Sequence, residues 1–590
     1  MSSQNEEKIY WNPEKPWGHE LIVNTLIEQG VEVIFCLTGG HIAPTLKAAE
    51  DKGIKVISNR TEEGAVMAAI GYAINSGKVG VAFLTAGMTG FAHPAILTAT
   101  MGQVPVVVIN GASESYADGT RHLQEFDTKA VAQNAQVKEA FHCTKWDRIP
   151  QMLTWAFKAA TGPVPGCAYI DFPVDLLCSQ GDPATLTKWA TSVCHARSQG
   201  DPTLVKEAVQ MLLNAKQPVI SVGRLAIYAG AEAEIKEIVE LTGIPVETCG
   251  GTLGTHPLNI GFQICNDADV ALLLGKLSAG LPGSLTSNTY VNAKLISVYP
   301  DPVDIGRCYP VDLGIAGDVK LVLRQMIEEV KKYKFPDYSE WVSTLMSMRE
   351  GTQYQFDSIA EESVTHFPIH PAVVTKTAVD WITENKLNKD AIMAIDGADC
   401  IYWWFMFSGA HGLSMEFPHQ VNYSGMLPLS LGQIGTGLAM AVGASIARPG
   451  KILIMPTLGD GSIGYHLAEF ETLARLNIPA VIIVHNNNAF GMVYADQRRI
   501  WGKSAGSGSF FSPDVHYEKV AEDLGCAKGE FVTKVEEIKP ALDRALERAK
   551  RESKPVVVTC MTDPNIYVLE WAWMLLPATP EGEPYQGMGY

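Results

Sequence analysis

The sequence predicts an α/β protein of three domains, each built on a mostly parallel β-sheet flanked by helices. Short apolar runs of strand length alternate with helical stretches along the chain, which is the pattern of parallel sheets. At 590 residues, with 47% hydrophobic and 19% charged residues, the chain is too long for one hydrophobic core and suits about three domains. The clearest apolar runs are VAFL from Val81, PVVVI from Pro105, PVISV from Pro218, VALLL from Val270 and PVVVT from Pro555.

Two changes in composition predict where the domains divide. The first is the polar turn from Gln199 to Pro202, and the second is the charged, aromatic stretch from Lys331 to Pro368. The first and third domains are expected to share a fold without visible sequence repetition. We expect an N-terminal extension over residues 1–16, a first domain over 17–199, a central domain over 200–345, a third domain over 366–565 and a tail over 566–590.

Charge and composition exclude several classes of protein. A formal net charge of −18, without clusters of Lys and Arg, argues against a nucleic-acid partner. The amino terminus lacks the regions of a signal peptide, and eleven cysteines show no CxxC or zinc spacing, so we expect a cytoplasmic protein with reduced thiols. The charge-free windows Val79–Ser113 and Val421–Ala447 are broken by prolines and glycines, which favours buried core over membrane spans.

One strand–helix–strand unit in the third domain carries the most informative motif. Lys451–Leu458 and Ala480–His485 are apolar runs typical of buried parallel strands, and Ile463–Leu476 between them has apolar residues at helical spacing. Asp460 and Asn487 each follow one of the two strands. Because ligands of such units collect at the carboxyl ends of the strands, we expect the side-chain oxygens of these two residues to converge.

Converging oxygens at this edge predict a divalent cation that holds a diphosphate. Mg²⁺ usually takes one or two carboxylates together with phosphate oxygens and water, which Asp460, Asn487 and a carbonyl near Ala489 would complement. Gly461 lets the backbone approach closely, and the N–H groups from Ser462 onward favour phosphate charge. The alternative is a plain strand-to-helix turn with an Asn-rich loop, but the paired placement on adjacent strand ends favours the metal site.

The segment from Gly459 to Met492 resembles the thiamine-diphosphate signature of the group that contains acetolactate synthase, pyruvate oxidase, oxalyl-CoA decarboxylase and benzaldehyde lyase. The resemblance implies thiamine diphosphate and Mg²⁺ as cofactors, with Asp460, Asn487 and the Ala489 carbonyl as metal ligands. It also implies that the first domain binds the pyrimidine of the cofactor and the third domain binds its diphosphate. The implied cofactor-binding residues of this segment are Asp460, Gly461, Ser462, Asn487, Ala489, Gly491 and Met492.

A second marker lies in the first domain. Lys55–Arg60 has the pattern of a short strand, and Thr61–Ala65 begins a helix that is rich in small residues. This segment resembles the Arg-His-Glu-Gln-Gly segment of the same family, so Glu62 is implied to be the acid that engages the pyrimidine nitrogen and activates the cofactor. An apolar pocket would raise the pKa of such a carboxyl and let it share a proton. The alternative is a carboxylate at a helix N-terminus, favoured by the helix dipole.

A third marker is the glycine-rich run from Gly432 to Leu438. It is similar to the family's Gly-x-hydrophobe-Gly-x-Gly-Leu loop, which implies that the Gly432 backbone meets the aminopyrimidine and that Ile434 lies between the two cofactor rings. Isoleucine differs from the methionine common in the synthases, which leaves the substrate class open. Without the resemblance, the run would be a closely packed helix entry.

The residues facing the substrate are expected to come from the first domain. His41 follows two glycines after an apolar strand and is similar in position to the histidine of benzaldehyde lyase, where it could move an alcohol proton. Gln124 could donate a hydrogen bond to a bound carbonyl. Asp127-Thr128 departs from the Asp-Gln of the lyases and oxalyl-CoA decarboxylases. A loop histidine with ordinary partners is the alternative for His41.

We therefore expect a thiamine-diphosphate and Mg²⁺ dependent lyase or carboligase acting on a carbon–carbon bond next to a carbonyl. Its substrate would be a 2-hydroxyacyl-CoA or a 2-hydroxy ketone, with acetolactate-synthase-like carboligation in reverse. The alternatives are a decarboxylase of 2-keto acids or of the oxalyl-CoA type, and a non-catalytic regulatory relative that only binds the cofactor. A nicotinamide enzyme is excluded because Met440 stands where the third glycine of its fingerprint belongs.

Three further expectations concern binding and assembly. The central domain is short after Leu258–Gly261 and reads Gly275–Ser278 where flavin-binding relatives carry an arginine nearby, so we expect no FAD. In this family the cofactor lies between two subunits, which implies a homodimer at least and a homotetramer as the expected assembly. The aromatic tail from Tyr567 to Tyr590 is expected to cover the cofactor cleft as a lid or to lie as a strap on an outer surface.

Overall fold

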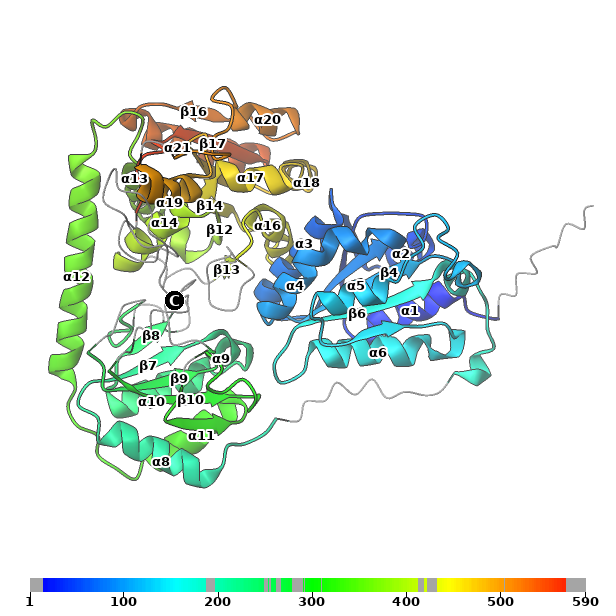
Figure 1. The fold of residues 1–590 in the computed structure, drawn as a ribbon, viewed down its shortest axis with the longest axis horizontal. Helices are drawn as coiled ribbons and strands as arrows, with labels where there is room; N and C mark the ends of the chain where they lie inside the picture. Colours follow the sequence, from blue (N-terminus) through cyan, green and yellow to red (C-terminus); the bar gives the residue numbers. More distant parts are fainter. Residues whose placement is uncertain are drawn as a thin grey trace, which may run out of the picture. The chain divides into compact units, whose positions relative to one another are not determined.

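The computed structural model describes residues 14–186, 197–248, 253, 256–261, 267–277, 290, 292–308, 310–411, 419–421, 432–502 and 505–568. The chain folds as two compact units (Figure 1). The first unit contains Met1–Ile70 with Lys78–Cys194, and the second contains Gly71–Gly77 with His195–Tyr590. The first unit holds one β-sheet and the second unit holds two.

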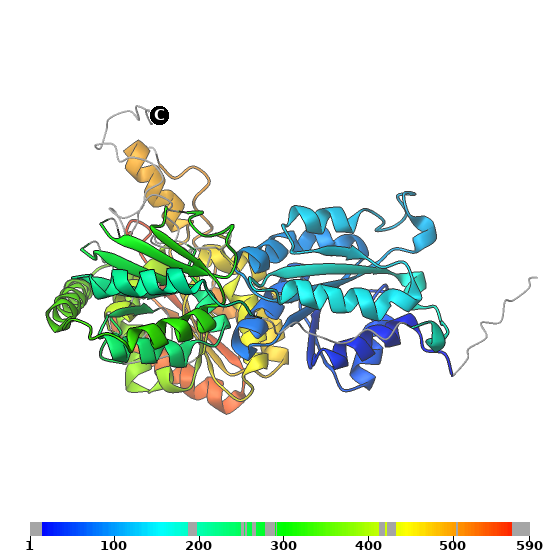
Figure 2. The ribbon, with the colours of Figure 1, turned by 90° about the horizontal axis from the view of Figure 1, so that it is seen from below.

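The sheet of the first unit has six parallel strands in the order β2-β1-β3-β4-β6-β5. Apolar side chains of α1, α2 and α6 pack on one face of it, and helices lie on both sides of the strands in Figure 2. The strands are β1 (Val33–Cys36), β2 (Lys55–Ser58), β3 (Gly80–Thr85), β4 (Val106–Ala112), β5 (Ala140–His142) and β6 (Cys167–Pro173). The helices are α1 (Gly18–Glu28), α2 (Ala43–Asp51), α3 (Glu62–Ser76), η1 (Ala86–Ala92), α4 (His93–Met101), η2 (Ser115–Ala117), α5 (Thr128–Asn134), η3 (Trp146–Arg148), α6 (Ile149–Ala160), α7 (Val174–Leu177) and η4 (Pro183–Thr185).

The central sheet has five parallel strands in the order β11-β10-β9-β7-β8. Its strands are β7 (Pro218–Val222), β8 (Val246–Thr248), β9 (Val270–Leu274), β10 (Lys294–Tyr299) and β11 (Leu313–Ala316). The accompanying helices are α8 (Pro202–Leu213), α9 (Arg224–Tyr228), α10 (Glu232–Thr242) and α11 (Val319–Val330). The side chain of Asp201 accepts a hydrogen bond from the Thr203 N–H and so caps α8 at the turn where the sequence predicts a domain boundary.

The third sheet has six parallel strands in the order β13-β12-β14-β15-β17-β16. Its strands are β12 (Ile392–Asp396), β13 (His419–Val421), β14 (Leu453–Gly459), β15 (Ala480–Asn486), β16 (Glu530–Val532) and β17 (Pro555–Met561). The helices are α13 (Pro371–Glu384), η5 (Leu387–Lys389), α14 (Asp399–Ala410), α16 (Gly437–Ala447), α17 (Asp460–His466), α18 (Glu469–Arg475), α19 (Gly491–Trp501), α20 (Tyr517–Asp523) and α21 (Val535–Glu552).

A long helix, α12 (Ser339–Glu362), occupies most of the charged stretch between the central and third domains (Figure 1). Trp341 and Leu345 near its start belong to a core cluster that includes strand residues of the central sheet. Phe356 near its end packs its ring against Trp403 and Phe407 of α14, with ring centroids 6.2 and 5.6 Å apart. This stretch is therefore a helix with apolar contacts to both domains and not an exposed linker.

The predicted fold class is confirmed, because the three sheets are parallel and flanked by helices. All five apolar runs named above form strands: β3, β4, β7, β9 and β17. The single helix expected over 463–476 is wrong in detail, since α17 ends at His466 and α18 begins at Glu469. Tighter hydrogen bonds, from the Phe470 N–H to the Leu467 carbonyl and from the Glu471 N–H to the Ala468 carbonyl, mark the break.

The remaining expectations about the fold concern the domain boundaries, the C-terminal tail and membrane spans. The domain boundaries stay a prediction, and the part of the tail after Val568 lies outside the described residues. Ile566, Tyr567 and Val568, where the tail begins, pack against the core of the third sheet. No helix within the described part of the chain combines the length and apolar character needed to cross a membrane.

The packing of α12 can be tested with two substitutions two residues apart on the same helix. Phe356→Ala should lower the free energy of unfolding by about 3–5 kcal/mol, because it removes a large ring from a closed core. Phe356 is 5% exposed and Tyr354 is 76% exposed, so Tyr354→Ala should change the free energy by less than about 0.5 kcal/mol. Urea unfolding followed by tryptophan fluorescence measures both. If Phe356→Ala and Tyr354→Ala change the free energy of unfolding equally little, Phe356 does not pack in a closed core.

Candidate functional site

The carboxyl ends of β14 and β15 bring Asp460 and Asn487 together. The two strands are neighbours in the sheet, with Gly459 opposite His485 in the register. Asp460 is buried, and its Oδ2 accepts a hydrogen bond from the Ala489 N–H at 3.3 Å. The Oδ1 of Asn487 accepts from the same N–H at 3.1 Å. The side-chain oxygens of the two residues therefore converge on one point, as the sequence predicts.

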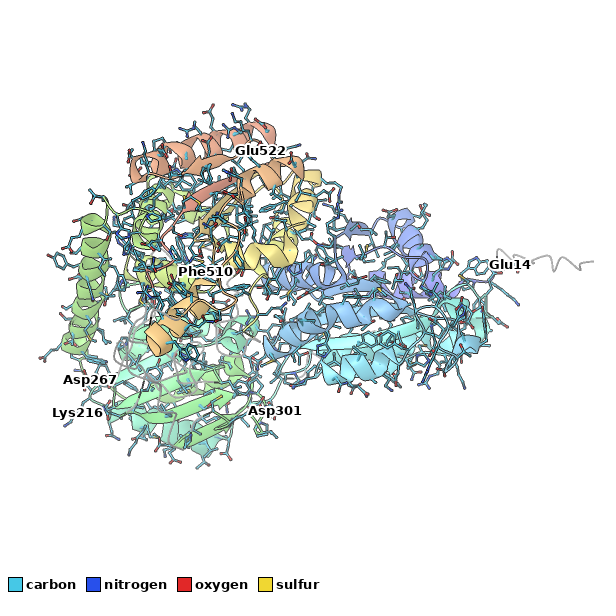
Figure 3. The ribbon with its side chains drawn as sticks, turned by 45° about the horizontal axis from the view of Figure 1, so that its top comes forward. Glu14, Lys216, Asp267, Asp301, Phe510 and Glu522 are labelled. Carbon is cyan, nitrogen blue, oxygen red and sulfur yellow. The ribbon has the colours of Figure 1, made fainter. Side chains whose placement is uncertain are left out.

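The turns that carry these two residues interlock, and the interlocking depends on glycine. A Cβ at position 461 would lie 2.8 Å from the Phe490 ring, and a Cβ at position 491 would lie 2.5 Å from Nδ2 of Asn487. The turn that follows β15 is also held by an isolated bridge between Ala489 and Phe510. Figure 3 labels Phe510. Gly461 thus lets the first turn approach the second, and Gly491 lets the second turn close on its own Asn487.

The electrostatics of Asp460 suit a bound cation. Burial raises the pKa of Asp460 to about 7, and the N–H groups of the turns, led by that of Gly461, oppose the rise. No basic side chain among the described residues forms an ion pair with this carboxylate. Burial, and next the charge of Asp460, raise the pKa of Tyr517 to about 12. A buried carboxylate without a counter-charge is costly, and a divalent cation would remove that cost.

The donor set suits magnesium better than zinc. In the described part of the chain, no three His, Cys, Asp or Glu side chains gather in a way that could hold a metal ion. Asp460 offers one carboxylate and Asn487 one amide oxygen. Mg²⁺ accepts a small number of protein oxygens because phosphate oxygens and water complete its octahedron. The residues present therefore fit a Mg²⁺ ion that is shared with a diphosphate.

The remaining predicted residues of this edge differ in their surroundings. Gly432 is exposed with φ +77°, and Ile434 is half-buried. Ser462 is buried in the first turn of α17. Met492 packs against the hydrophobic core of the third sheet, so its proposed contact with a cofactor stays a prediction.

The residues Gly432–Gly437 are called the glycine loop below. The sequence analysis did not predict two residues that lie beside this loop. Asp396, the last residue of β12, accepts hydrogen bonds from the N–H groups of Gly435 and Gly437 at 3.0 and 2.8 Å. His466, the last residue of α17, contacts the Gly435 carbonyl through Nδ1 at 2.6 Å. An acid directly after the apolar run IMAI was the available sequence signal for Asp396. Nothing in the sequence singles out His466.

Glu62 lies in the first unit, at the start of α3, the helix that follows β2. The Oγ1 of Thr61 accepts a hydrogen bond from the Gly64 N–H at 2.9 Å and so caps the helix. Glu62 is half-buried, and burial raises the pKa of its carboxyl, while the Glu62 N–H opposes the rise. The direction of this pKa shift is the one that the sequence predicts for the activating acid.

His41 follows β1 and is fixed by close contacts with the two neighbouring strand ends. A Cβ at Gly39 would lie 2.2 Å from Oγ1 of Thr85 at the end of β3, and a Cβ at Gly111 would lie 2.7 Å from the His41 carbonyl oxygen. The Nδ1 of His41 is buried and has no hydrogen-bond partner among the described residues. Burial lowers the pKa of the imidazole, and the charge of Glu114 opposes this. The lowered pKa favours the neutral form of the ring.

Gln124 belongs to the same edge of the first sheet. Its backbone adopts φ +62° and lies within contact distance of Gly87, where a Cβ would be 3.1 Å from the Gln124 carbonyl oxygen. Glu62, His41 and Gly87 follow β2, β1 and β3, which are neighbours in the sheet. The structure thus gathers the three predicted residues of the first unit at the carboxyl end of one sheet.

A separate polar group fills the corresponding edge of the central sheet. Glu247 is buried on β8 and accepts hydrogen bonds from Tyr290 and from Oγ of Ser221, the latter at 2.7 Å. Lys276, after β9, donates to Oγ of Ser221 at 2.9 Å and lies 3.6 Å from the Glu247 carboxylate. These side chains therefore serve as hydrogen-bond and charge partners for one another. The expectation that no FAD binds here stays a prediction.

Comparisons with known proteins agree with this arrangement. Models of the thiamine pyrophosphate enzymes match residues 16–131 as the N-terminal TPP binding domain, 205–326 as the central domain and 407–560 as the C-terminal TPP binding domain. The chain is 30% identical over 563 residues to the probable acetolactate synthase large subunit of Methanococcus aeolicus, with 90% of each chain covered. It is 29% identical over 580 residues to the acetolactate synthase isozyme 3 large subunit of Escherichia coli, with 93% of this chain and 96% of the relative covered. It is 26% identical over 588 residues to 2-hydroxyacyl-CoA lyase 1 of Mus musculus, with 96% of each covered.

Replacing Asp460 tests the metal site. Asp460→Asn should weaken Mg²⁺-dependent binding of thiamine diphosphate by at least roughly 100-fold, because losing even an outer partner of a metal ligand commonly costs 10- to 100-fold. Isothermal titration calorimetry with and without Mg²⁺ measures this. Asp357→Asn is the control, because Asp357 on α12 contacts His411 and is not one of the candidate site residues. Undiminished Mg²⁺-dependent binding by Asp460→Asn would show that the ion is held elsewhere.

Proposed function

We propose that this chain, which belongs to the thiamine pyrophosphate enzyme family, breaks or forms a carbon–carbon bond next to a carbonyl group, with Mg²⁺ as the second cofactor. The substrate class is a 2-hydroxyacyl-CoA or a 2-hydroxy ketone, and the reverse reaction is a carboligation like that of acetolactate synthase. The names of its relatives, acetolactate synthase and 2-hydroxyacyl-CoA lyase, both describe chemistry at such a bond. The active unit is proposed to be at least a homodimer.

The observation that carries the proposal is the state of His41. Its buried Nδ1 has no hydrogen-bond partner in the described part of the chain, and burial lowers the pKa of the ring, which favours its neutral form. A neutral imidazole can accept the proton of a substrate hydroxyl group while the adjoining carbon–carbon bond breaks, and can return it in the reverse direction. Simple decarboxylation of a 2-keto acid needs no such proton transfer from a hydroxyl group, which is why lyase chemistry is favoured.

The cofactor and the protein divide the chemistry between them. Bound thiamine diphosphate supplies a nucleophilic carbon and an electron sink for the bond that breaks. Glu62 would hold a proton at the pyrimidine nitrogen of the cofactor, and burial, which raises the pKa of its carboxyl, favours the protonated form. Gln124 donates a hydrogen bond to the substrate carbonyl. Asp460, Asn487 and the Ala489 carbonyl hold the ion that anchors the diphosphate.

A substrate screen tests the reaction class directly. The protein loaded with thiamine diphosphate and Mg²⁺ should cleave 2-hydroxyacyl-CoA esters or 2-hydroxy ketones to an aldehyde and a second carbonyl product, detected by chromatography with mass spectrometry. His41→Phe should lower this cleavage by about 100-fold or more, the usual contribution of a general acid or base. Turnover of 2-keto acids or oxalyl-CoA alone, with carbon dioxide released, would identify a decarboxylase in place of the proposed lyase.

Glu62→Gln separates an enzyme from a relative that only binds the cofactor. The amide cannot share a proton with the pyrimidine ring, so turnover should fall by about 100- to 10,000-fold. Binding of thiamine diphosphate should stay within a few-fold of that of the wild-type protein, since the metal site is unchanged. Steady-state kinetics and calorimetry on the same preparation give the two readouts. A variant with wild-type turnover would remove Glu62 from the proposed mechanism.

A further inference from the structure

The glycine loop is held by hydrogen bonds from two different elements of the third domain. Asp396 is fully buried at the end of β12, and its Oδ1 accepts hydrogen bonds from the N–H groups of Gly397 and Gly435 at 2.7 and 3.0 Å. Its Oδ2 accepts from the Gly437 N–H at 2.8 Å. One carboxylate thus receives three backbone donors, two of them from the loop. Charge-assisted bonds of this kind are among the stronger ones in proteins.

The opposite side of Gly435 is held by His466. The Nδ1 of His466 lies 2.6 Å from the Gly435 carbonyl oxygen, and His466 is 2% exposed. Because a carbonyl can only accept, Nδ1 must carry the hydrogen. Gly435 is therefore fixed through both of its polar backbone groups, its N–H by Asp396 and its carbonyl by His466. This fixes the backbone direction of Ile434, the residue before Gly435.

The contacts around the loop also explain its glycines. A Cβ at position 435 would lie 2.4 Å from Cβ of Tyr465, and Gly435 has φ +86°, a conformation that disfavours other residues. A Cβ at position 437 would lie 2.6 Å from Cβ of Asp396. Both glycines are needed for the loop to reach Asp396 and α17, independently of any ligand. The Gly-x-Gly spacing here is thus a requirement of the protein's own packing.

We propose that Asp396 and His466 are positioning residues, which hold the glycine loop so that Gly432 and Ile434 can receive the aminopyrimidine of the cofactor. The inference rests on the proposed use of thiamine diphosphate. Both residues act through the backbone of the loop, His466 through Gly435 and Asp396 through Gly435 and Gly437. His466 stands at the end of the helix that begins with Asp460, so the same short helix carries the metal ligand and one support of the loop.

Cofactor binding tests the proposal without reference to any substrate. Asp396→Asn leaves at least one of the three N–H donors facing an amide N–H, and His466→Leu removes the donor to Gly435. Each should weaken thiamine diphosphate binding in the presence of Mg²⁺ by about 10- to 100-fold, the effect of one unpaired buried polar group. Binding of inorganic diphosphate with Mg²⁺ should change by less than about 2-fold, because it uses only the metal site. His466→Asn should recover most of the loss, since its amide nitrogen can take the place of Nδ1.

A control variant and a second measurement make the outcome decisive. Asp357→Asn removes a carboxylate that contacts another histidine, His411, at 2.9 Å, and should leave both ligands bound as in the wild-type protein. The circular dichroism of the bound aminopyrimidine should change in Asp396→Asn and His466→Leu only. If Asp396→Asn does not fold, the His466→Leu and His466→Asn pair decides. Normal cofactor affinity and dichroism in His466→Leu would overturn the positioning role alone, whereas a wild-type protein that binds diphosphate but not thiamine diphosphate would overturn the proposed function as well.

Discussion

The buried carboxylate of Asp460 is the constraint on which the organisation of the third domain depends. Burial disfavours its charge, and backbone N–H groups of the two turns oppose that effect. The glycine at position 461 allows close contact between the turns, and the glycine at position 491 allows close contact with Asn487 within the second turn. The interlocked turns and the start of α17 at Asp460 all follow from keeping one carboxylate at the edge of a parallel sheet. A divalent cation would supply the positive charge that the described side chains do not.

The edge of the first sheet also carries ionisable groups after the ends of parallel strands, and burial shifts their pKa values as it shifts that of Asp460. Burial raises the pKa of Glu62 and lowers the pKa of His41, so both groups are pushed toward their neutral forms. Glu62 and His41 are groups that can exchange protons, whereas Asp460 has its carboxylate oxygen beside the amide oxygen of Asn487, an arrangement that suits the binding of an ion. The two kinds of site thus match the roles that the family resemblance implies for the first and third domains.

The sequence predicts those parts of the fold and site that follow from local pattern. Apolar runs identify strands because strands buried on both faces have few polar residues, and the convergence of Asp460 and Asn487 follows from their places after neighbouring strands. The roles of Asp396 and His466 could not be predicted, because each depends on a hydrogen bond to Gly435 that joins residues about 30 to 40 positions apart. The helical nature of 339–362 was also missed. Its apolar residues are few and divide their contacts between two cores, which hides the usual helical pattern.

The break between α17 and α18 has a geometric reason in this arrangement. An α-helix rises about 1.5 Å per residue, so α17 separates Asp460 from His466 by roughly 9 Å along its axis. In the proposed function Asp460 serves the diphosphate end of the cofactor, and His466 supports the loop for its pyrimidine end. The length of α17 then sets the distance between those two supports. The break at Leu467 and Ala468 ends α17 at His466, which keeps its contact with Gly435, while α18 beyond the break contacts β17 and α16.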